Sequence, residues 1–275
     1  MVEAAIRPRG LYSLRLTART ETWTARLRDE RWAEARQRHD GSILVRASCE
    51  RAVEEVRFLL ALDDDTSEFH RRFARDPLLG PSVRVLRGLR PTRTSTVAHA
   101  VLRAICGQLT QSRRAREIER TVIRAAGENP PSREALARLS PAALAGLGLA
   151  TSRAATLARL VRTIDLESLK SAPSATALAR LQRERGIGPW SVGVIALQGL
   201  GRYDTGLVAD LGLVKLYASL RRRWPEQPAE TAELLEPYGE WQGLASVFLL
   251  AGFVRGLVPG ASADRARLVR GRRAA

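Results

Sequence analysis

The spacing of apolar residues changes once along this chain, near residue 50, and this change restricts the fold more than any other feature. Ahead of it, apolar and polar residues alternate, which is typical of half-buried strands. The clearest such segments are 10–18, 21–29 and 42–48. Behind it, apolar residues recur every three or four positions, as on one face of a helix. The sequence therefore predicts an α+β protein, with a small N-terminal antiparallel β-rich domain at 1–65 and an all-α body at 66–260.

The charge of the chain is distributed unevenly between these two parts. Lys and Arg number 45 against 29 Asp and Glu, so the formal net charge is +16. Residues 1–65 carry 12 of each sign, which leaves the whole excess in the rest of the chain. A basic body favours a polyanionic partner such as nucleic acid, although a basic surface can also serve solubility alone. Residues 261–275 form a basic tail with no convincing partner face, and we predict that it is mobile.

Several classes of protein conflict with the sequence. Apolar stretches such as 247–254 are far shorter than the roughly 20 residues that span a bilayer, and the first residues lack the apolar core of a signal peptide. Cys49 and Cys106 are too few for a disulfide framework or a four-cysteine metal site. We therefore expect a cytoplasmic protein with reduced thiols and no membrane contact.

A run of three aspartates, Asp63 to Asp65, allows two interpretations. The three carboxylates could form a metal cluster. We favour the other interpretation, in which Asp65 caps the next helix and Glu68, three residues later, completes a capping box.

The segment Gly186-Ile187-Gly188-Pro189 joins two predicted helices and carries the most information. Two glycines let the chain reverse within four residues, and proline suits the first turn of the second helix. The bare N–H groups at that helix start can bind a phosphate oxygen without any side chain. Ile187 would anchor the hairpin in the core. The alternative is an ordinary tight turn between helices, with no ligand.

A second informative residue is an aspartate that follows the hairpin, directly ahead of another predicted helix. Asp210 lies 22 residues after Gly188, directly before the apolar helical run that begins at Leu211. Its carboxylate is therefore predicted at a helix N-terminus. Such an aspartate can also be a plain cap without a chemical role.

Together, these ordered motifs resemble the helix-hairpin-helix DNA glycosylases, and within them the AlkA-type 3-methyladenine DNA glycosylases. The β-rich start is similar to the N-terminal domain of that branch. Further similar segments are 105–110 (ICGQLT), 146–154 (GLGLATSRA) and 209–213 (ADLGL). The resemblance covers most of the chain, and it implies two helical subdomains within 66–260 with a cleft between them.

The resemblance also implies roles for individual residues. Asp210 would be the catalytic carboxylate. The hairpin residues would grip a DNA phosphate, in that family often through a bound Na⁺ or K⁺ on the backbone of Gly186 and Gly188. No other cofactor or protein-chelated metal is expected. These hairpin residues are Gly186, Ile187, Gly188 and Pro189.

Two further groups of residues would act on DNA. Leu109 would be the wedge that fills the stack where the target base leaves, with Gln108 beside it. Arg113 and Arg114 follow closely in the sequence, so we expect them to contact DNA as well. The base pocket would be lined by Trp190, Val194 and Leu250.

The activity implied is base-excision repair. A monomer, associated with the nucleoid, would bind double-stranded DNA with a damaged base and hydrolyse the N-glycosidic bond of 3-methyladenine-like purines. Trp190 stands where bifunctional relatives carry a nucleophilic lysine, which implies no lyase activity. Val194 and Leu250 stand where the well-studied pocket has aromatic rings. Two alternatives therefore stay open: a non-catalytic protein that binds damaged DNA, and a glycosylase for other damaged bases.

Overall fold

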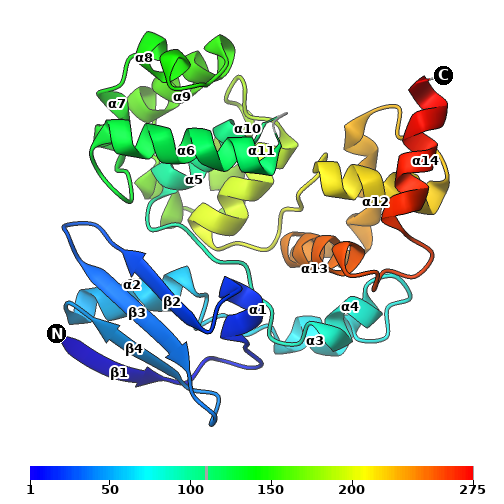
Figure 1. Ribbon diagram of the computed structural model, residues 1–275, viewed down its shortest axis with the longest axis horizontal. Coiled ribbons are helices and arrows are strands. Elements are labelled where there is room, and N and C mark those ends of the chain that lie inside the picture. The colour runs from blue at the N-terminus through cyan, green and yellow to red at the C-terminus, as the bar shows by residue number, and fades with distance from the viewer. Residues whose placement is uncertain (109–110, 275) are drawn as a thin grey trace.

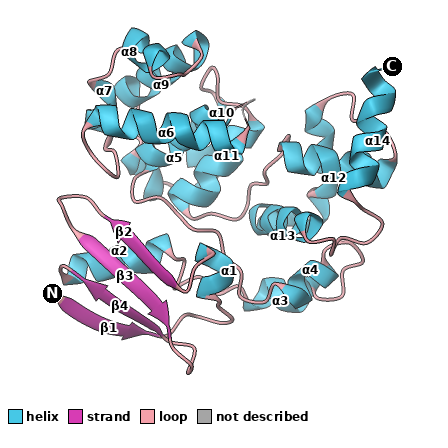
Figure 2. Cartoon of the chain, viewed as in Figure 1, coloured by secondary structure: helices cyan, strands magenta, loops and turns pink. Residues whose placement is uncertain are grey.

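The computed structural model describes residues 1–108 and 111–274 and contains a small sheet followed by a larger helical body (Figures 1 and 2). The predicted α+β class is confirmed. The helical body forms two groups in Figure 1. Helices α5 to α11 lie together above the sheet in this view. Helices α12 to α14 lie at the right, with α3 and α4 below them.

The N-terminal sheet is antiparallel, with strand order β1-β4-β3-β2. Its strands are β1 (Val2–Ile6), β2 (Thr22–Arg26), β3 (Trp32–Gln37) and β4 (Ile43–Ala47). Alternation along β4 buries Ile43, Val45 and Ala47 on one face, and helix α2 (Glu50–Leu59) covers that face with Val53 and Val56. The sheet and α2 therefore have a hydrophobic core of their own.

The prediction of a strand over 10–18 is wrong, because residues 14–18 form helix α1 (Leu14–Ala18). Ser13 caps this helix, and its Oγ accepts a hydrogen bond from the Leu16 amide at 3.3 Å. Leu14 and Thr17 are the buried residues of the helix, three positions apart. In so short a segment the apolar residues fit either period, because Leu14 and Leu16 alternate as on a strand while Leu11, Leu14 and Ala18 recur at helical spacing. The serine cap decides the outcome.

Helix α5 (Val97–Gly107) is the centre of the helical body, since it contacts α6, α7, α9 and α11. The other α-helices are α3 (Ser67–Phe73), α4 (Gly80–Val85), α6 (Ser112–Ala126), α7 (Arg133–Ala137), α8 (Pro141–Gly146), α9 (Thr151–Thr163), α10 (Ser174–Gln182), α11 (Pro189–Val194), α12 (Leu211–Arg221), α13 (Gln242–Val254) and α14 (Ala263–Ala274). A π-helical segment, η2 (Ile195–Leu200), continues α11, and three 3₁₀ segments complete the body: η1 (Glu167–Lys170), η3 (Pro228–Leu234) and η4 (Glu236–Trp241). Within the described part of the chain, no helix is both long enough and apolar enough to cross a membrane.

The three consecutive aspartates do not form a cluster. Asp63 pairs with Arg57 at 2.6 Å, and Asp64 pairs with Arg93. Asp65 accepts a hydrogen bond from the Ser67 amide at 2.9 Å, but α3 has Thr66 at its N-cap and no side-chain cap. The predicted capping box is therefore wrong, because the helix starts one residue later than the box requires.

The prediction of a mobile tail is also corrected, since residues 263–274 form helix α14. Ala266 is buried against the core, and α14 packs on α12. Ser219 of α12 fixes the start of α14: its Oγ accepts from the Ser262 amide at 2.8 Å and donates to the Ser262 carbonyl at 3.1 Å. The partner face that the sequence did not reveal is therefore supplied by α12.

A buried arginine joins the β-rich part to the helical body. Arg90 has no solvent exposure, and its guanidinium donates hydrogen bonds to backbone carbonyls of the N-terminal part. The acceptors are the carbonyl oxygens of Arg9, Leu11, Ala61 and Leu62. The guanidinium also lies 5.1 Å from the centre of the Tyr12 ring. Burial lowers the pKa of Arg90, so the carbonyl oxygens and the ring offset a real desolvation cost.

Candidate functional site

The carboxylate of Asp210 is fixed at the N-terminus of α12. Asp210 is the N-cap residue, and its Oδ1 accepts a hydrogen bond from the Gly212 amide at 2.7 Å. Its backbone carbonyl accepts from the Val214 amide at 2.8 Å, so the helix begins directly after it. The positive end of the helix dipole stabilises a negative charge at this position. The side chain is only half-buried, which leaves it open to a ligand.

Trp190 holds the other oxygen of the same carboxylate. Its indole Nε1–H donates a hydrogen bond to Asp210 Oδ2 at 2.9 Å. The indole ring lies against Gly107, where a Cβ would be 2.5 Å from Trp190 Cη2. The sequence did not predict this arrangement. The signal for it in the sequence is the glycine that ends α5.

The three residues predicted to line the base pocket do not all lie beside the Asp210 carboxylate. Leu250 of α13 is half-buried, and its Cδ2 occupies the space that a Cβ on Gly212 would need. It therefore lies beside the residue that holds Asp210. Val194 is 5% exposed and belongs to the core of the helical body. The structure thus brings Trp190 and Leu250 to the carboxylate and buries Val194 among core side chains.

The hairpin between α10 and α11 has the form that its glycines predict. Gly186 adopts a φ of +87°, and a Cβ there would be 2.6 Å from Thr156 Oγ1, so no other residue fits without strain. Ile187 is 7% exposed and packs into the core as predicted. Gly188 has open space around its Cα, with no atom within 4 Å of a built Cβ. The backbone of the second glycine is therefore accessible from outside.

Two side-chain groups that the sequence analysis missed hold the hairpin in place. Glu184 is buried and pairs with Arg159 and, at 3.3 Å, with Arg180. Gln108 Nε2 donates to the Gly186 carbonyl at 2.8 Å and to Ser191 Oγ at 3.0 Å. Gln108 therefore ties the end of α5 to the hairpin. Its contact with DNA stays a prediction, and Leu109, the predicted wedge, lies outside the described residues.

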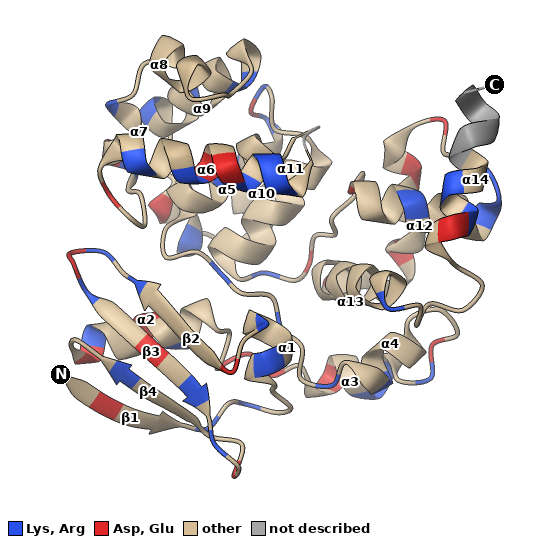
Figure 3. Ribbon diagram, viewed as in Figure 1, with Lys and Arg blue, Asp and Glu red and all other residues tan. Residues whose placement is uncertain are grey.

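The predicted arginines stand on the exposed start of α6. The side chains of Arg113 and Arg114 are 92% and 61% exposed, and both lie near Glu117, at 3.3 and 3.6 Å. Figure 3 shows basic residues along α6, broken by an acidic position. Exposed pairs of this kind are weak, so both guanidinium groups can exchange Glu117 for a phosphate.

The segment ahead of Asp210 is tied down at several points. Tyr203 donates to the Asp64 carboxylate, which also pairs with Arg93. Ala209 has a left-handed φ of +68°, and its amide donates to Thr231 Oγ1 at 2.7 Å. A non-glycine residue with positive φ persists only where surrounding contacts hold it. These contacts fix the backbone directly ahead of Asp210.

Metal-binding capacity is limited in the described part of the chain. No group of three or more His, Cys, Asp and Glu side chains there could hold an ion. At the hairpin, the carbonyl oxygens of Glu184, Gly186 and Gly188 each accept one hydrogen bond. Each oxygen keeps a second lone pair, and the monovalent cation at the hairpin stays a prediction.

Comparison with known sequences supports the resemblance. No protein-family model matches the chain. A DNA-3-methyladenine glycosylase of Bacillus subtilis is 28% identical over 73% of this chain and 71% of its own length. A probable bifunctional transcriptional activator/DNA repair enzyme AlkA of Mycobacterium tuberculosis is 30% identical over 59% of this chain. The matched part is only 35% of that protein.

Solved structures show the same fold. A 3-methyladenine DNA-glycosylase from Archaeoglobus fulgidus superposes with a TM-score of 0.75 at 17% identity, covering 92% of this chain and 98% of that one. A Clostridium acetobutylicum 8-oxoguanine glycosylase/lyase in complex with double-stranded DNA gives 0.70 at 17% identity, covering 94% and 99%. Together with the sequence relatives, these structures confirm the resemblance to the helix-hairpin-helix DNA glycosylases of the AlkA type.

Proposed function

We propose that this chain is a base-excision DNA glycosylase that hydrolyses the N-glycosidic bond of alkylated, 3-methyladenine-like purines in duplex DNA. One observation carries the proposal. The Asp210 carboxylate is held through both oxygens, by Gly212 and Trp190, and Trp190 itself belongs to the hairpin helix. Trp190 therefore connects the hairpin, which we propose binds DNA, to the fixed carboxylate of Asp210. The names of the sequence relatives support the substrate class.

The chemistry follows from the position of this anion. The target base must leave the stack, at a cost of a few kcal/mol, and Leu109 would fill the gap. Alkylation at a ring nitrogen makes the base cationic and a good leaving group. The transition state places positive charge on the sugar, which a fixed carboxylate stabilises while it orients or deprotonates water. Each Asp210 oxygen accepts one hydrogen bond in the structure and keeps a lone pair for this task.

Strand cleavage is not part of the proposal. A lyase needs an amine that forms a Schiff base with the sugar, whereas the side chain that reaches Asp210 from the hairpin helix is the indole of Trp190. We expect no covalent complex when the protein is treated with borohydride in the presence of abasic DNA. A trapped complex would contradict the monofunctional assignment.

The test of the main proposal is the substitution Asp210→Asn, which keeps the hydrogen-bond geometry of one oxygen but removes the charge. Single-turnover release of 3-methyladenine from methylated duplex should fall about 10²- to 10³-fold, while affinity for an abasic-site duplex persists. The matched control is Asp204→Asn. Asp204 lies on the same connecting segment and accepts a hydrogen bond from Ser174 Oγ at 2.5 Å, so its loss should leave the rate unchanged.

Other outcomes distinguish the alternatives. Leu250, an aliphatic residue at the Gly212 side of the carboxylate, favours a protein that binds damaged DNA without excision, because a cationic base gains from aromatic contact. Binding of lesion duplexes with no release of free base would establish that alternative. Release of a different free base from a panel of defined lesions would establish a glycosylase for other damage.

We also propose that the protein acts as a monomer and that Na⁺ or K⁺ binds at the hairpin, on the second lone pairs of the Glu184, Gly186 and Gly188 carbonyls. Replacing both ions with tetramethylammonium at constant ionic strength should weaken binding to abasic duplex. Equal affinity in the two salts would contradict a specific cation.

Sedimentation of the protein with and without duplex tests the monomer. Nucleoid association stays a prediction, which imaging of the tagged protein would check.

A further inference from the structure

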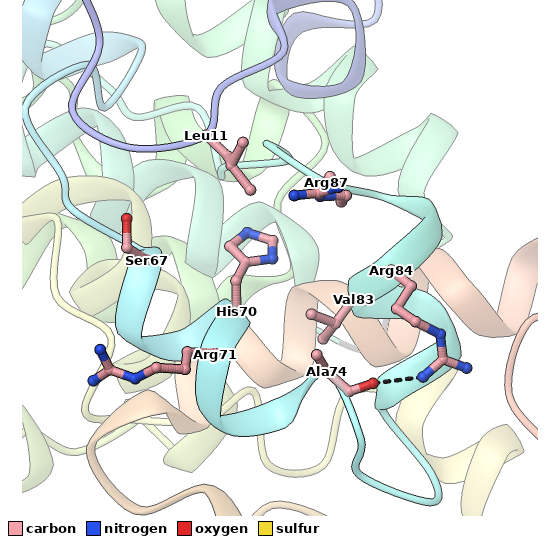
Figure 4. Close-up of a pocket in the computed structure, with 8 residues that line it drawn as sticks. All are labelled: Leu11, Ser67, His70, Arg71, Ala74, Val83, Arg84 and Arg87. Carbon is pink, nitrogen blue, oxygen red and sulfur yellow. Dashed lines mark hydrogen bonds between the residues drawn. The ribbon is translucent and has the colours of Figure 1, made fainter.

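A cavity of about 460 Å³ opens between the loop ahead of α1 and the helices α3 and α4 (Figure 4). It belongs to no part of the proposed glycosylase site, whose residues come from α5, α11, α12 and α13. Its size is within the range of small-molecule sites. The polar side chains that line it are Ser67, His70, Arg71, Arg84 and Arg87.

Three arginines line the cavity, and no aspartate or glutamate of the described residues lines it with them. In the described parts of the chain, no carboxylate forms an ion pair with Arg71, Arg84 or Arg87, and Arg84 donates only to the Ala74 carbonyl. The neighbouring Arg72, which does not line the cavity, pairs with Glu240 at 2.9 Å. Figure 4 shows Arg87 beside the His70 ring, whereas the guanidinium groups of Arg71 and Arg84 extend outward from the edge of the cavity. Positive charge at this edge raises the local concentration of anions.

A buried imidazole in the wall supplies an independent observation. His70 is 8% exposed, and its Nε2 is enclosed without a hydrogen-bond partner among the described residues. Figure 4 shows the ring standing among the lining residues, pointing toward Leu11 and Arg87. Buried polar groups normally have a partner. Burial, with the positive charges of Arg87 and Arg90, lowers the pKa of His70, so an anion would relieve both the missing bond and the repulsion.

We propose that this cavity is a second anion site that binds the phosphate group of a small molecule or of nucleic acid, with His70 as hydrogen-bond donor, Arg87 as the charge partner beside it and Arg71 at the outer edge. Arg84 closes the rim. Planar guanidinium groups match the oxygens of a phosphate. The acidic groups at this end of α3 are Glu68, in the first turn, and Asp65, whose Oδ1 accepts from the Ser67 amide at 2.9 Å. Neither lines the cavity, so its lining has an excess of positive charge.

The direct test is calorimetric titration of the full chain with inorganic pyrophosphate at low salt and neutral pH. We expect saturable binding that Arg87→Gln weakens by about tenfold, the size expected for loss of a charge-assisted pair. Arg75→Gln is the matched control, because Arg75 is exposed on the same stretch but does not line the cavity. It should bind as the wild type does. No binding, or equal binding by wild type and Arg87→Gln, would overturn the proposal.

Proton linkage tests the imidazole. An anion beside His70 raises its pKa, so binding near neutral pH should take up protons. This uptake appears as a dependence of the measured enthalpy on the ionisation enthalpy of the buffer. His70→Gln, checked for an unchanged circular dichroism spectrum, should lose that dependence. Persistence of the full proton uptake in a folded His70→Gln protein would remove His70 from the site.

Duplex DNA identifies the source of the phosphate. If Arg87→Gln weakens binding of an undamaged duplex as well as pyrophosphate, the site takes a backbone phosphate. If duplex affinity stays the same while pyrophosphate binding is lost, the ligand is a free phosphate compound. Both results support the anion site. Asp210→Asn should not change pyrophosphate binding, so failure of the glycosylase proposal and failure of this one can be told apart.

Discussion

The hydrogen bond from Trp190 to Asp210 gives the sharpest prediction for catalysis. Trp190→Phe removes the indole Nε1–H, the donor to Asp210 Oδ2 at 2.9 Å, and keeps an aromatic ring in the space beside Gly107. The Gly212 amide still holds Oδ1 at 2.7 Å. The carboxylate would therefore keep its charge and one anchor but lose its fixed orientation.

The expected size follows from the strength of this bond. A hydrogen bond to a charged group contributes about 1.5–3 kcal/mol. Each 1.36 kcal/mol of barrier changes the rate about tenfold, so full use of the bond in the transition state gives a loss of about 10- to 150-fold. We expect the lower half of this range, because the Gly212 amide restricts the carboxylate to a small set of orientations. Affinity for an abasic duplex should not change.

Single-turnover release of 3-methyladenine with enzyme in excess measures the chemical step directly. Trp23→Phe is the matched control, since Trp23 is a partly buried tryptophan of β2 in the N-terminal domain. It should excise at the wild-type rate. A Trp190→Phe protein that is folded and as fast as the wild type would refute the idea that Trp190 orients the carboxylate.

Three further substitutions test the hairpin, the helix contact and the response to acid. Gly188→Glu should greatly weaken binding to an abasic duplex while Gly188→Ala does not, because a Cβ at residue 188 meets no atom within 4 Å and only glutamate adds negative charge. Equal affinities of the two variants would argue against phosphate contact there. Gly107→Ala should slow excision through its overlap with Trp190, whereas Gly146→Ala, in open space, should leave the rate unchanged and raise thermal stability slightly. Burial lowers the pKa of His99, and the Glu119 carboxyl, although buried, has its pKa lowered by its bonds to His99 and Arg103. Both groups are deprotonated in the folded state, so the free energy of unfolding falls as pH drops below about 6.5. His99→Gln should therefore reduce the fall in melting temperature between about pH 7 and pH 5. An unchanged dependence of melting temperature on pH would contradict this.

The sequence predicted the features that depend on neighbours along the chain. The change of period near residue 50 predicts the division into sheet and helices, and the apolar run that begins at Leu211 places Asp210 at the start of a helix. Ser132 and Ser140 likewise cap α7 and α8 through hydrogen bonds to backbone amides three residues later. Each of these features is set by a local rule of spacing or capping.

The features that escaped prediction depend on contacts between distant segments. The bond between Trp190 and Asp210 joins residues 20 apart, and Gly107 makes room for it from a third helix. Helix α14 is fixed by Ser219, 43 residues before Ser262. Spacing alone does not state which helices approach one another, so neither contact could be inferred from periodicity.

The buried guanidinium of Arg90 has a consequence for how the molecule comes apart. Its carbonyl acceptors lie in residues 9–62, while Arg90 itself leads into the helical body. Detaching the sheet would break these hydrogen bonds together, and a hydrogen bond to a charged group contributes about 1.5–3 kcal/mol. We therefore expect the sheet and the helices to unfold together, in one cooperative transition.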